Sequence, residues 1–405
     1  MPGESPLSMM RPASRQARKL GAGPTRRPWR PLFALVVIVI VLALGWVWLW
    51  YYAAAVADRT LAGWVDREAA AGRIYSCGAQ SISGFPFRIA ARCVDAAAAI
   101  KSNQPPYAIK AKSVVFAAEL FHPTGLIGDI AGPLTLAELG QPPSLVADWA
   151  RARLSVSGRP PNPERVSVSL QAPQLGRVGA AAAGGNGEML FAAKEADFEG
   201  RIAAGAADDH PVIEATLALA GATAPTLHPL FAAPIDVALN AVLRGFKDLS
   251  PAKSWAERFR EMQAAGGGLE IKSLRFTQGS AIVVGTGTLS VNAHGKLDGV
   301  IRVAIVDLEH IVPLLGIDRL IGQGIDRLSG ADPSVAQGLG ALDRLMPGLG
   351  VAVRETANAS LIENIKKMGQ PSTVDNRPAV MLPLRFADGS IYLGMLRLGE
   401  APPLF

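Results

Sequence analysis

The sequence predicts a mainly β protein with a few helices, in which one N-terminal transmembrane helix precedes an elongated antiparallel β-sheet domain. Three observations predict this fold class. A run of nineteen uncharged, largely apolar residues lies near the N-terminus, at positions 32–50. Much of the later chain alternates apolar and polar residues with a period of two, which is typical of half-buried strands. Helical periodicity appears in only a few later segments, most clearly over 250–265.

The net charge of +6 comes from the first 30 residues. These residues hold seven bases and one acid, whereas the remaining 375 residues hold 33 of each. A domain that binds nucleic acid requires a basic excess or a basic stripe. We therefore expect a disordered basic tail over 1–30 and no nucleic-acid partner.

The apolar run is long enough to cross a bilayer, because a membrane-spanning helix needs about 20 residues at 1.5 Å each. The preceding bases place the N-terminus in the cytoplasm by the positive-inside rule. We predict an anchor over 31–52 in the bacterial inner membrane, a helical stalk over 53–72 that ends at Gly72, and a periplasmic β-rich domain over 73–405. Aromatic residues favour membrane interfaces, and the predicted belt consists of Trp46, Trp48, Trp50, Tyr51 and Tyr52.

Two other interpretations of the apolar run stay open. A buried core helix would not need the flanking bases or the aromatic belt. A cleaved signal peptide would use Ala55-Val56-Ala57 as its cleavage site, but its apolar region usually has only about 7–15 residues. The length of the run favours the anchor over both.

The two cysteines, Cys77 and Cys93, bracket a predicted hairpin whose turn contains Gly84-Phe85-Pro86. If the turn is centred on Phe85, the numbers of paired residues sum to 170 and the cysteines face each other. Opposed residues lie about 4.5–5.5 Å apart at Cα, within disulfide reach. Because the periplasm is oxidising, we predict a disulfide. A thioredoxin-type redox pair or a zinc site would need other spacings or more ligands.

Alternating runs and turn signals predict the remaining strands. They lie over 108–116, 147–157, 166–170, 197–202, 213–220, 281–291, 296–306, 379–386 and 391–398. Residues 236–243 fit either a strand or a short helix. Together these segments suggest two β halves, 73–249 and 266–405, joined by the helix over 250–265.

The helix over 250–265 has Ser250 as its expected N-cap and Pro251 at its first position. Its apolar stripe of Trp255, Phe259 and Met262 is expected to pack in the core, with a ligand-facing lid as the alternative. Two further amphipathic helices are expected over 310–328 and 334–346.

No catalytic or metal-binding constellation stands out. None of the five histidines lies in a His-Glu-x-x-His motif, and Asp208-Asp209-His210 is typical of a solvated turn. Gly285-Thr286-Gly287-Thr288 lacks the later Gly and Lys of a phosphate loop. We therefore expect no enzyme, no cofactor and no metal, although an active site assembled from scattered residues would leave no sequence motif.

The turn residues Phe85, Pro86, Phe87 and Arg88 have two interpretations. The aromatic rings could plug the sheet beside a rigid turn. Alternatively, the four residues could form a docking tip for a partner or a membrane surface.

Several residues resemble the bacterial, mostly alphaproteobacterial, family known as domain of unknown function 2125. The resemblance rests on Trp64, Gly72-Arg73, Cys77, Ile82, the segment 84–88, Cys93, Gly132-Pro133-Leu134 and the segment 382–386. It covers the chain from about residue 55 to the end, and it implies an N-terminal anchor with no assigned activity. A looser likeness, in hairpin style only, links the chain to AsmA-like periplasmic proteins that handle lipids.

The sequence therefore favours an anchored periplasmic protein that binds or passes lipid-like molecules in envelope maintenance. The alternative is an anchored interaction or scaffold module whose partners are other envelope proteins.

Overall fold

A computed structural model describes residues 29–101, 105–119, 121–159, 162–178, 187–203, 210–247, 253–314, 362–394 and 396–405. The chain divides into two units, Met1–Ala53 and Ala54–Phe405. The predicted tail over 1–30 and the predicted helix over 334–346 lie outside the described residues, except for the last two residues of the tail. The same holds for most of the predicted helix over 310–328.

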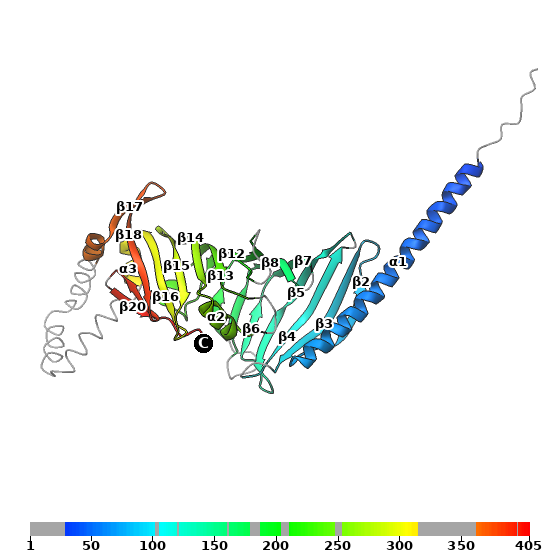
Figure 1. Ribbon diagram of the computed structural model, residues 1–405, viewed down its shortest axis with the longest axis horizontal. Helices are drawn as coiled ribbons and strands as arrows, with labels where there is room; N and C mark the ends of the chain where they lie inside the picture. The colour runs from blue at the N-terminus through cyan, green and yellow to red at the C-terminus, as the bar shows by residue number, and fades with distance from the viewer. Residues whose placement is uncertain are drawn as a thin grey trace, which may run out of the picture. The chain divides into compact units, whose positions relative to one another are not determined.

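The second unit is dominated by β-strands, as predicted (Figure 1). The strands of its first half are β1 (Arg73–Ser76), β2 (Ala79–Ser83), β3 (Arg88–Ile100), β4 (Tyr107–Glu119), β5 (His122–Glu138), β6 (Leu145–Asp148), β7 (Arg151–Arg159), β8 (Asn162–Gln171), β9 (Gln174–Arg177), β10 (Glu188–Ala192), β11 (Glu195–Ile202) and β12 (Ile213–Ala222). Those that follow are β13 (Ile235–Arg244), β14 (Gly268–Gln278), β15 (Ala281–Val291), β16 (Leu297–Val306), β17 (Gln370–Val374), β18 (Arg377–Ala387), β19 (Ser390–Leu393) and β20 (Leu396–Glu400).

Four labelled helical elements precede or interrupt the strands in the part of the chain that the structure describes. They are α1 (Trp29–Ala70), η1 (Pro229–Phe231), α2 (Trp255–Ala264) and α3 (Leu308–Leu314). Residues 362–368 are also helical. Among the described residues, α1 alone is long and apolar enough to cross a membrane, from Leu32 onward, which fits the predicted anchor.

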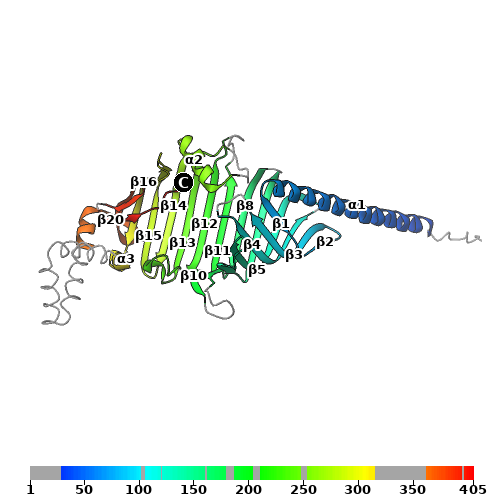
Figure 2. The same cartoon turned by 90° about the horizontal axis from the view of Figure 1, so that it is seen from below.

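The strands form one antiparallel sheet (Figure 2). Its main ladder runs β2–β3–β4–β5–β7–β8–β11–β12–β13–β14–β15–β16–β18–β19–β20. A side branch of β6, β9 and β10 leaves the ladder at β5. The segment over 236–243 is a strand, and its pairing with β14 carries the ladder past α2 without a break. The division of the domain into two halves stays a prediction.

The end of α1 packs against the first strands, so the stalk over 53–72 is helical as predicted. The Trp64 ring lies 4.9 Å from the Tyr75 ring, and the Gln80 amide donates a 2.9 Å hydrogen bond to Asp58. Arg73 forms a hydrogen-bonded ion pair with Glu68, and both side chains are 14% exposed. Gly72 follows the helix with a φ of 79°, a conformation that suits glycine.

The Glu68–Arg73 pair predicts a pH dependence of stability. The hydrogen bond from Arg73 holds the pKa of Glu68 below its usual 4.5, although burial acts in the opposite direction. Because the folded-state pKa is lowered, the pair stabilises the fold above pH 4.5, and this contribution is lost as the pH falls through the folded-state value. We expect Glu68→Gln to lower the melting temperature at pH 7 and to lower it less near pH 3, below the usual pKa of 4.5. An equal effect at both pH values would contradict this role.

Cys77 and Cys93 form the predicted disulfide, with Cα atoms 5.5 Å apart. The register used to predict it was wrong, because paired residues of β2 and β3 have numbers that sum to 173, as in Gln80 opposite Cys93. The turn is longer than expected and closes with a hydrogen bond from Arg88 N to Gly84 O. Cys77 lies in the break between β1 and β2, from which its side chain reaches Cys93 across the ladder.

The disulfide should contribute strongly to stability. Replacing both cysteines by serine is expected to lower the free energy of unfolding by about 3 kcal/mol, since the bond closes a loop of roughly 15 residues in the unfolded chain. Chemical denaturation would measure the loss, and a reductant should produce the same loss in the wild type and none in the double variant. Equal stability of the two proteins without reductant would refute the prediction.

Helix α2 begins later than predicted. Its N-cap is Ser254, which forms a capping box with Glu257, whereas 250–252 lie outside the described residues. A capping box satisfies two backbone N–H groups, which explains the later start. Of the predicted stripe, Met262 is buried and Phe259 packs beside it, but Trp255 is 71% exposed. The core-packing prediction is therefore wrong for Trp255.

The last predicted strand is in fact two strands. The hairpin through Asp388-Gly389 is confirmed, since Ala387 pairs with Ser390. The segment 391–398 then turns back at Gly394, whose φ of 61° favours glycine, and its two parts pair as β19 and β20.

Candidate functional site

An uninterrupted apolar row crosses thirteen strands of the ladder. Residues that face each other in an antiparallel pair project to the same side of the sheet. From β2 to β18 the row consists of Ile82, Ala91, Phe116, Gly128, Leu154, Val168, Phe198, Leu217, Leu239, Leu274, Gly285, Val303 and Leu382.

A second apolar row runs beside the first on the same face. From β3 to β19 it consists of Ile89, Ala118, Leu126, Val156, Val166, Gly200, Ala215, Ala241, Ile271, Gly287, Ile301, Leu384 and Leu393. A bulge in β14 between Ile271 and Leu274 adds one residue without exchanging the faces. Neither row contains a charged or hydrogen-bonding side chain, so one face of the sheet is apolar along its length.

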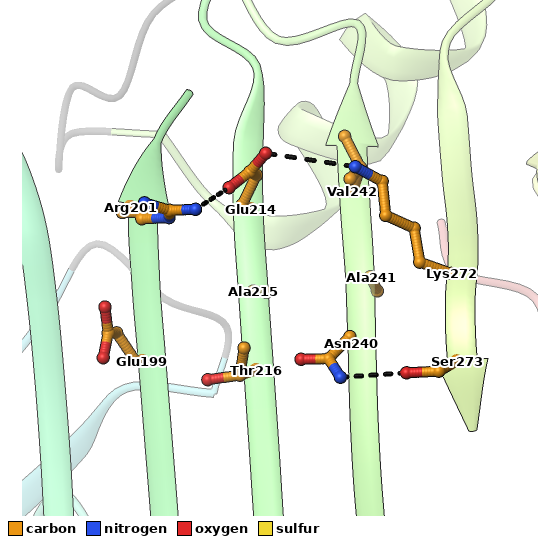
Figure 3. A pocket seen from close by; sticks show the side chains of 10 residues that line it. All are labelled: Glu199, Arg201, Glu214, Ala215, Thr216, Asn240, Ala241, Val242, Lys272 and Ser273. Atoms are coloured by element: carbon orange, nitrogen blue, oxygen red, sulfur yellow. Dashed lines mark hydrogen bonds and ion pairs between the residues drawn. The ribbon is translucent and has the colours of Figure 1, made fainter. Parts of the chain in front are cut away.

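The opposite face is polar in the central strands. In each central strand, the residue that lies between the members of the two apolar rows projects to this opposite face. These residues are Ser155, Ser167, Glu199, Thr216, Asn240 and Ser273. Glu214 on this face forms two ion pairs, 2.5 Å from Arg201 and 4.0 Å from Lys272 (Figure 3). Asn240 donates a 2.9 Å hydrogen bond to Ser273.

These side chains line a shallow hollow of about 390 Å³ on the polar face. Its acids and bases balance and are partly exposed, so it offers no excess charge to an ion. Across the ranges that the structure describes, no group of three or more His, Cys, Asp or Glu side chains could hold a metal.

The apolar face changes from exposed to buried along the ladder. In the earlier strands Phe116, Leu126 and Phe198 are 37%, 39% and 42% exposed. In the later strands Ile271 and Leu382 are at most 6% exposed.

The later strands are covered by local elements. Their apolar side chains form a core with Leu308 and Ile311 of α3 and with Ile365 of the helix over 362–368. Helix α2 and the C-terminal Phe405 cover one end of the central strands (Figure 2). Within the described ranges, the members of the two apolar rows from β2 to β12 belong to no such buried cluster. We call six of them the open apolar face: Phe116, Leu126, Leu154, Val168, Phe198 and Leu217.

The predicted tip residues do not plug the sheet. Phe85 and Phe87 are 52% and 60% exposed. A third ring, Phe121, was not predicted from the sequence to lie near them. It is 64% exposed in the neighbouring β4–β5 turn, and its ring centre lies 6.3 Å from that of Phe87. Arg88 is directly paired with Glu119 across β3 and β4, and both border a hollow between the two rings. No linear motif joins positions 85 and 121, so only the fold reveals this cluster.

The predicted belt residues lie near the end of the apolar part of α1. Trp48, Tyr51 and Tyr52 are 68%, 65% and 55% exposed, and Trp48 stacks on Tyr52 at 5.7 Å. Trp46 is half-buried and Trp50 is buried. The role of these aromatics at a membrane interface stays a prediction.

Comparison with known proteins gives one match. The family described as "Uncharacterized protein conserved in bacteria (DUF2125)" matches residues 50–402, close to the range expected from the sequence. No curated protein and no solved structure matches the chain, so the looser AsmA-like likeness gains no support. Since the match spans the stalk, the disulfide hairpin and the whole sheet, the chain belongs to the bacterial DUF2125 family.

Proposed function

We propose that the protein is an inner-membrane-anchored periplasmic protein that binds the acyl chains of lipid-like molecules on its open apolar face. The continuous apolar rows carry this proposal. Soluble domains rarely expose contiguous apolar patches of this kind, and such patches usually mark binding surfaces. The bound molecule must itself be apolar, since the two rows offer it no charge or hydrogen-bonding side chain.

The periplasmic location is also a proposal. The disulfide supports it, because such bonds persist in oxidising compartments and are rare in the cytosol. The basic tail supports it as well, since its seven bases precede α1 and favour the cytoplasmic side.

The rows suggest passage as well as binding. They begin in β2 and β3, at the edge of the sheet that the α1 stalk covers, and continue into the covered strands. Acyl chains could slide along such a surface because every position offers a similar apolar contact. We therefore propose the open apolar face as a track that leads acyl chains away from the anchored edge.

Quantifying the lipid retained by the purified full chain would test this proposal. Any anchored protein carries lipid around its helix, so the comparison must keep α1 unchanged. Leu154→Asp places a charge on the open apolar face, while Ser155→Asp places the same charge on the polar face one residue away. We expect mass spectrometry to find less lipid per chain for Leu154→Asp alone. Equal retention by wild type and both variants, with all three folded, would contradict it.

The second candidate is an interaction module. In the described chain, β20 pairs only with β19, so its other edge could accept a strand from a partner. However, β20 is short and carries Arg397 and Glu400, features that usually protect an edge from pairing. We therefore favour lipid binding.

A further inference from the structure

Three exposed phenylalanine rings gather where two hairpin turns meet. Phe85 and Phe87 belong to the β2–β3 turn and Phe121 belongs to the β4–β5 turn. Each ring is more than half exposed. The turns lie at the same end of the sheet, since Arg88 pairs with Glu119 beside them. We call this cluster the aromatic tip.

Three contacts fix the direction in which the tip points. Glu68 meets Arg73, Trp64 meets Tyr75 and Asp58 meets Gln80. From the first contact to the third, the helix residue number decreases from 68 to 58 while the strand residue number increases from 73 to 80. The stalk and β1–β2 therefore run antiparallel. The aromatic tip therefore points toward the N-terminal end of the stalk, where the chain leaves the apolar span.

Chain geometry shows how far the tip reaches. From Asp58 back to Ala54 the helix advances about 6 Å, at 1.5 Å per residue. From Gln80 to the end of β2 at Ser83 the strand advances about 10 Å, at 3.3 Å per residue. The end of β2 thus lies roughly 4 Å beyond the level of Ala54 along the stalk, and the turn that carries the tip follows it. From Ala54 the chain continues toward its N-terminus for four residues to Trp50, where the uncharged span ends.

The chemistry of the tip suits a bilayer interface. Aromatic rings favour this layer, where acyl chains meet headgroups. Arg88 lies opposite Glu119, so the site carries no excess positive charge. Insertion would therefore be driven by the rings and would not require anionic lipid.

We propose that the aromatic tip inserts into the leaflet from which the stalk emerges, giving the domain a second point of attachment beside α1. The occupant is the phospholipid interface of that leaflet. Two attachments would fix the anchored edge of the sheet against the membrane, with Phe87 two residues before Ile89, the first member of an apolar row. The tip would insert whether or not acyl chains occupy the open apolar face, so the two proposals can fail separately.

Fluorine NMR on the full chain in phosphatidylcholine nanodiscs would test the insertion. Trifluoromethyl-phenylalanine replaces Phe87 or Phe121 in separate samples, which keeps an aromatic ring at each site. The control carries the same label at Leu227, which is 75% exposed in the turn between β12 and β13. Each sample is measured with an acyl-chain nitroxide lipid and then with a water-soluble gadolinium chelate.

We expect the nitroxide lipid to broaden the signals at 87 and 121 and the chelate to leave them sharp. The label at 227 should show the reverse. Replacing part of the phosphatidylcholine by phosphatidylglycerol should not change the result. Labels at 87 and 121 that behave like the label at 227, or a lipid effect at only one of the two positions, would overturn the proposal.

Discussion

Replacing Phe198 by aspartate is expected to weaken acyl-chain binding at least about tenfold. The Phe198 ring lies near the middle of the open apolar face and is 42% exposed, so a ligand chain can cover it. Burying a fully exposed aromatic side chain contributes about 1.5–3 kcal/mol, so covering the exposed 42% of Phe198 contributes roughly 1 kcal/mol, and 1.4 kcal/mol corresponds to a factor of ten in affinity. Aspartate removes this contact and leaves a carboxylate that an acyl chain cannot solvate. Titration with a fluorescent fatty acid would measure the change.

Phe198→Leu is the matched control. It keeps an apolar side chain at the same place in the row, so its affinity should stay near that of the wild type. Thermal unfolding of both variants separates lost binding from lost folding, and a half-exposed position should tolerate both substitutions. Wild-type affinity in a folded Phe198→Asp protein would show that this face does not hold the chain.

Replacing Leu382 by alanine is expected to lower the free energy of unfolding by about 2–5 kcal/mol, the usual cost of removing a large buried aliphatic side chain. Leu382 is 1% exposed and continues the same apolar row into the covered half of the sheet. The side chains around it are held by strands and by α3, so the cavity can collapse only in part. Chemical denaturation followed by circular dichroism would measure the loss.

The neighbouring Met381→Ala is the control for that variant. Met381 projects to the opposite face and lies in none of the buried clusters. Met381→Ala should lower the free energy of unfolding much less than Leu382→Ala does. Equal losses would mean that the covered half of the apolar face is not the main core of the later strands.

Much of the fold could be predicted from periodicity. The apolar-rich runs over 281–291 and 296–306, with the turn residues between them, predicted a hairpin that the structure confirms along its whole length. The ambiguous segment 236–243 became a strand because β12 and β14 both pair with it, which its local pattern could not reveal. The start of α2 was misplaced because Ser250-Pro251 and Ser254 both carry capping signals, and only Ser254 has Glu three residues later.

The disulfide shows a correct prediction reached through a wrong register. A turn of unknown length moves every paired position, and the added turn residues changed the sum of paired numbers from 170 to 173. The bond still forms because the break at Cys77 and Gly78 lets the chain depart from strict pairing. The spacing of the two cysteines therefore predicted correctly that they lie close together, but not which residues face each other across the hairpin.

The candidate site could be predicted only in part. Alternation over 147–157 already indicated one apolar and one polar face for that hairpin. The pattern of a single strand could not reveal two properties of the site. One is the alignment of such faces across thirteen strands, and the other is that no described element buries the apolar rows of the earlier strands. Both depend on inter-strand register and on which distant helices reach the sheet, and sequence periodicity encodes neither.

Photo-crosslinking from adjacent positions of one strand tests the central claim most directly. A photoreactive phenylalanine analogue at Leu217 faces the open apolar side, whereas the same analogue at Thr216 faces the polar side between Glu199 and Asn240. Irradiation of cells that make the full chain should yield phospholipid or fatty-acid adducts at 217 and none at 216. Equal lipid labelling at both positions, or protein adducts alone at 217, would contradict acyl-chain binding on this face.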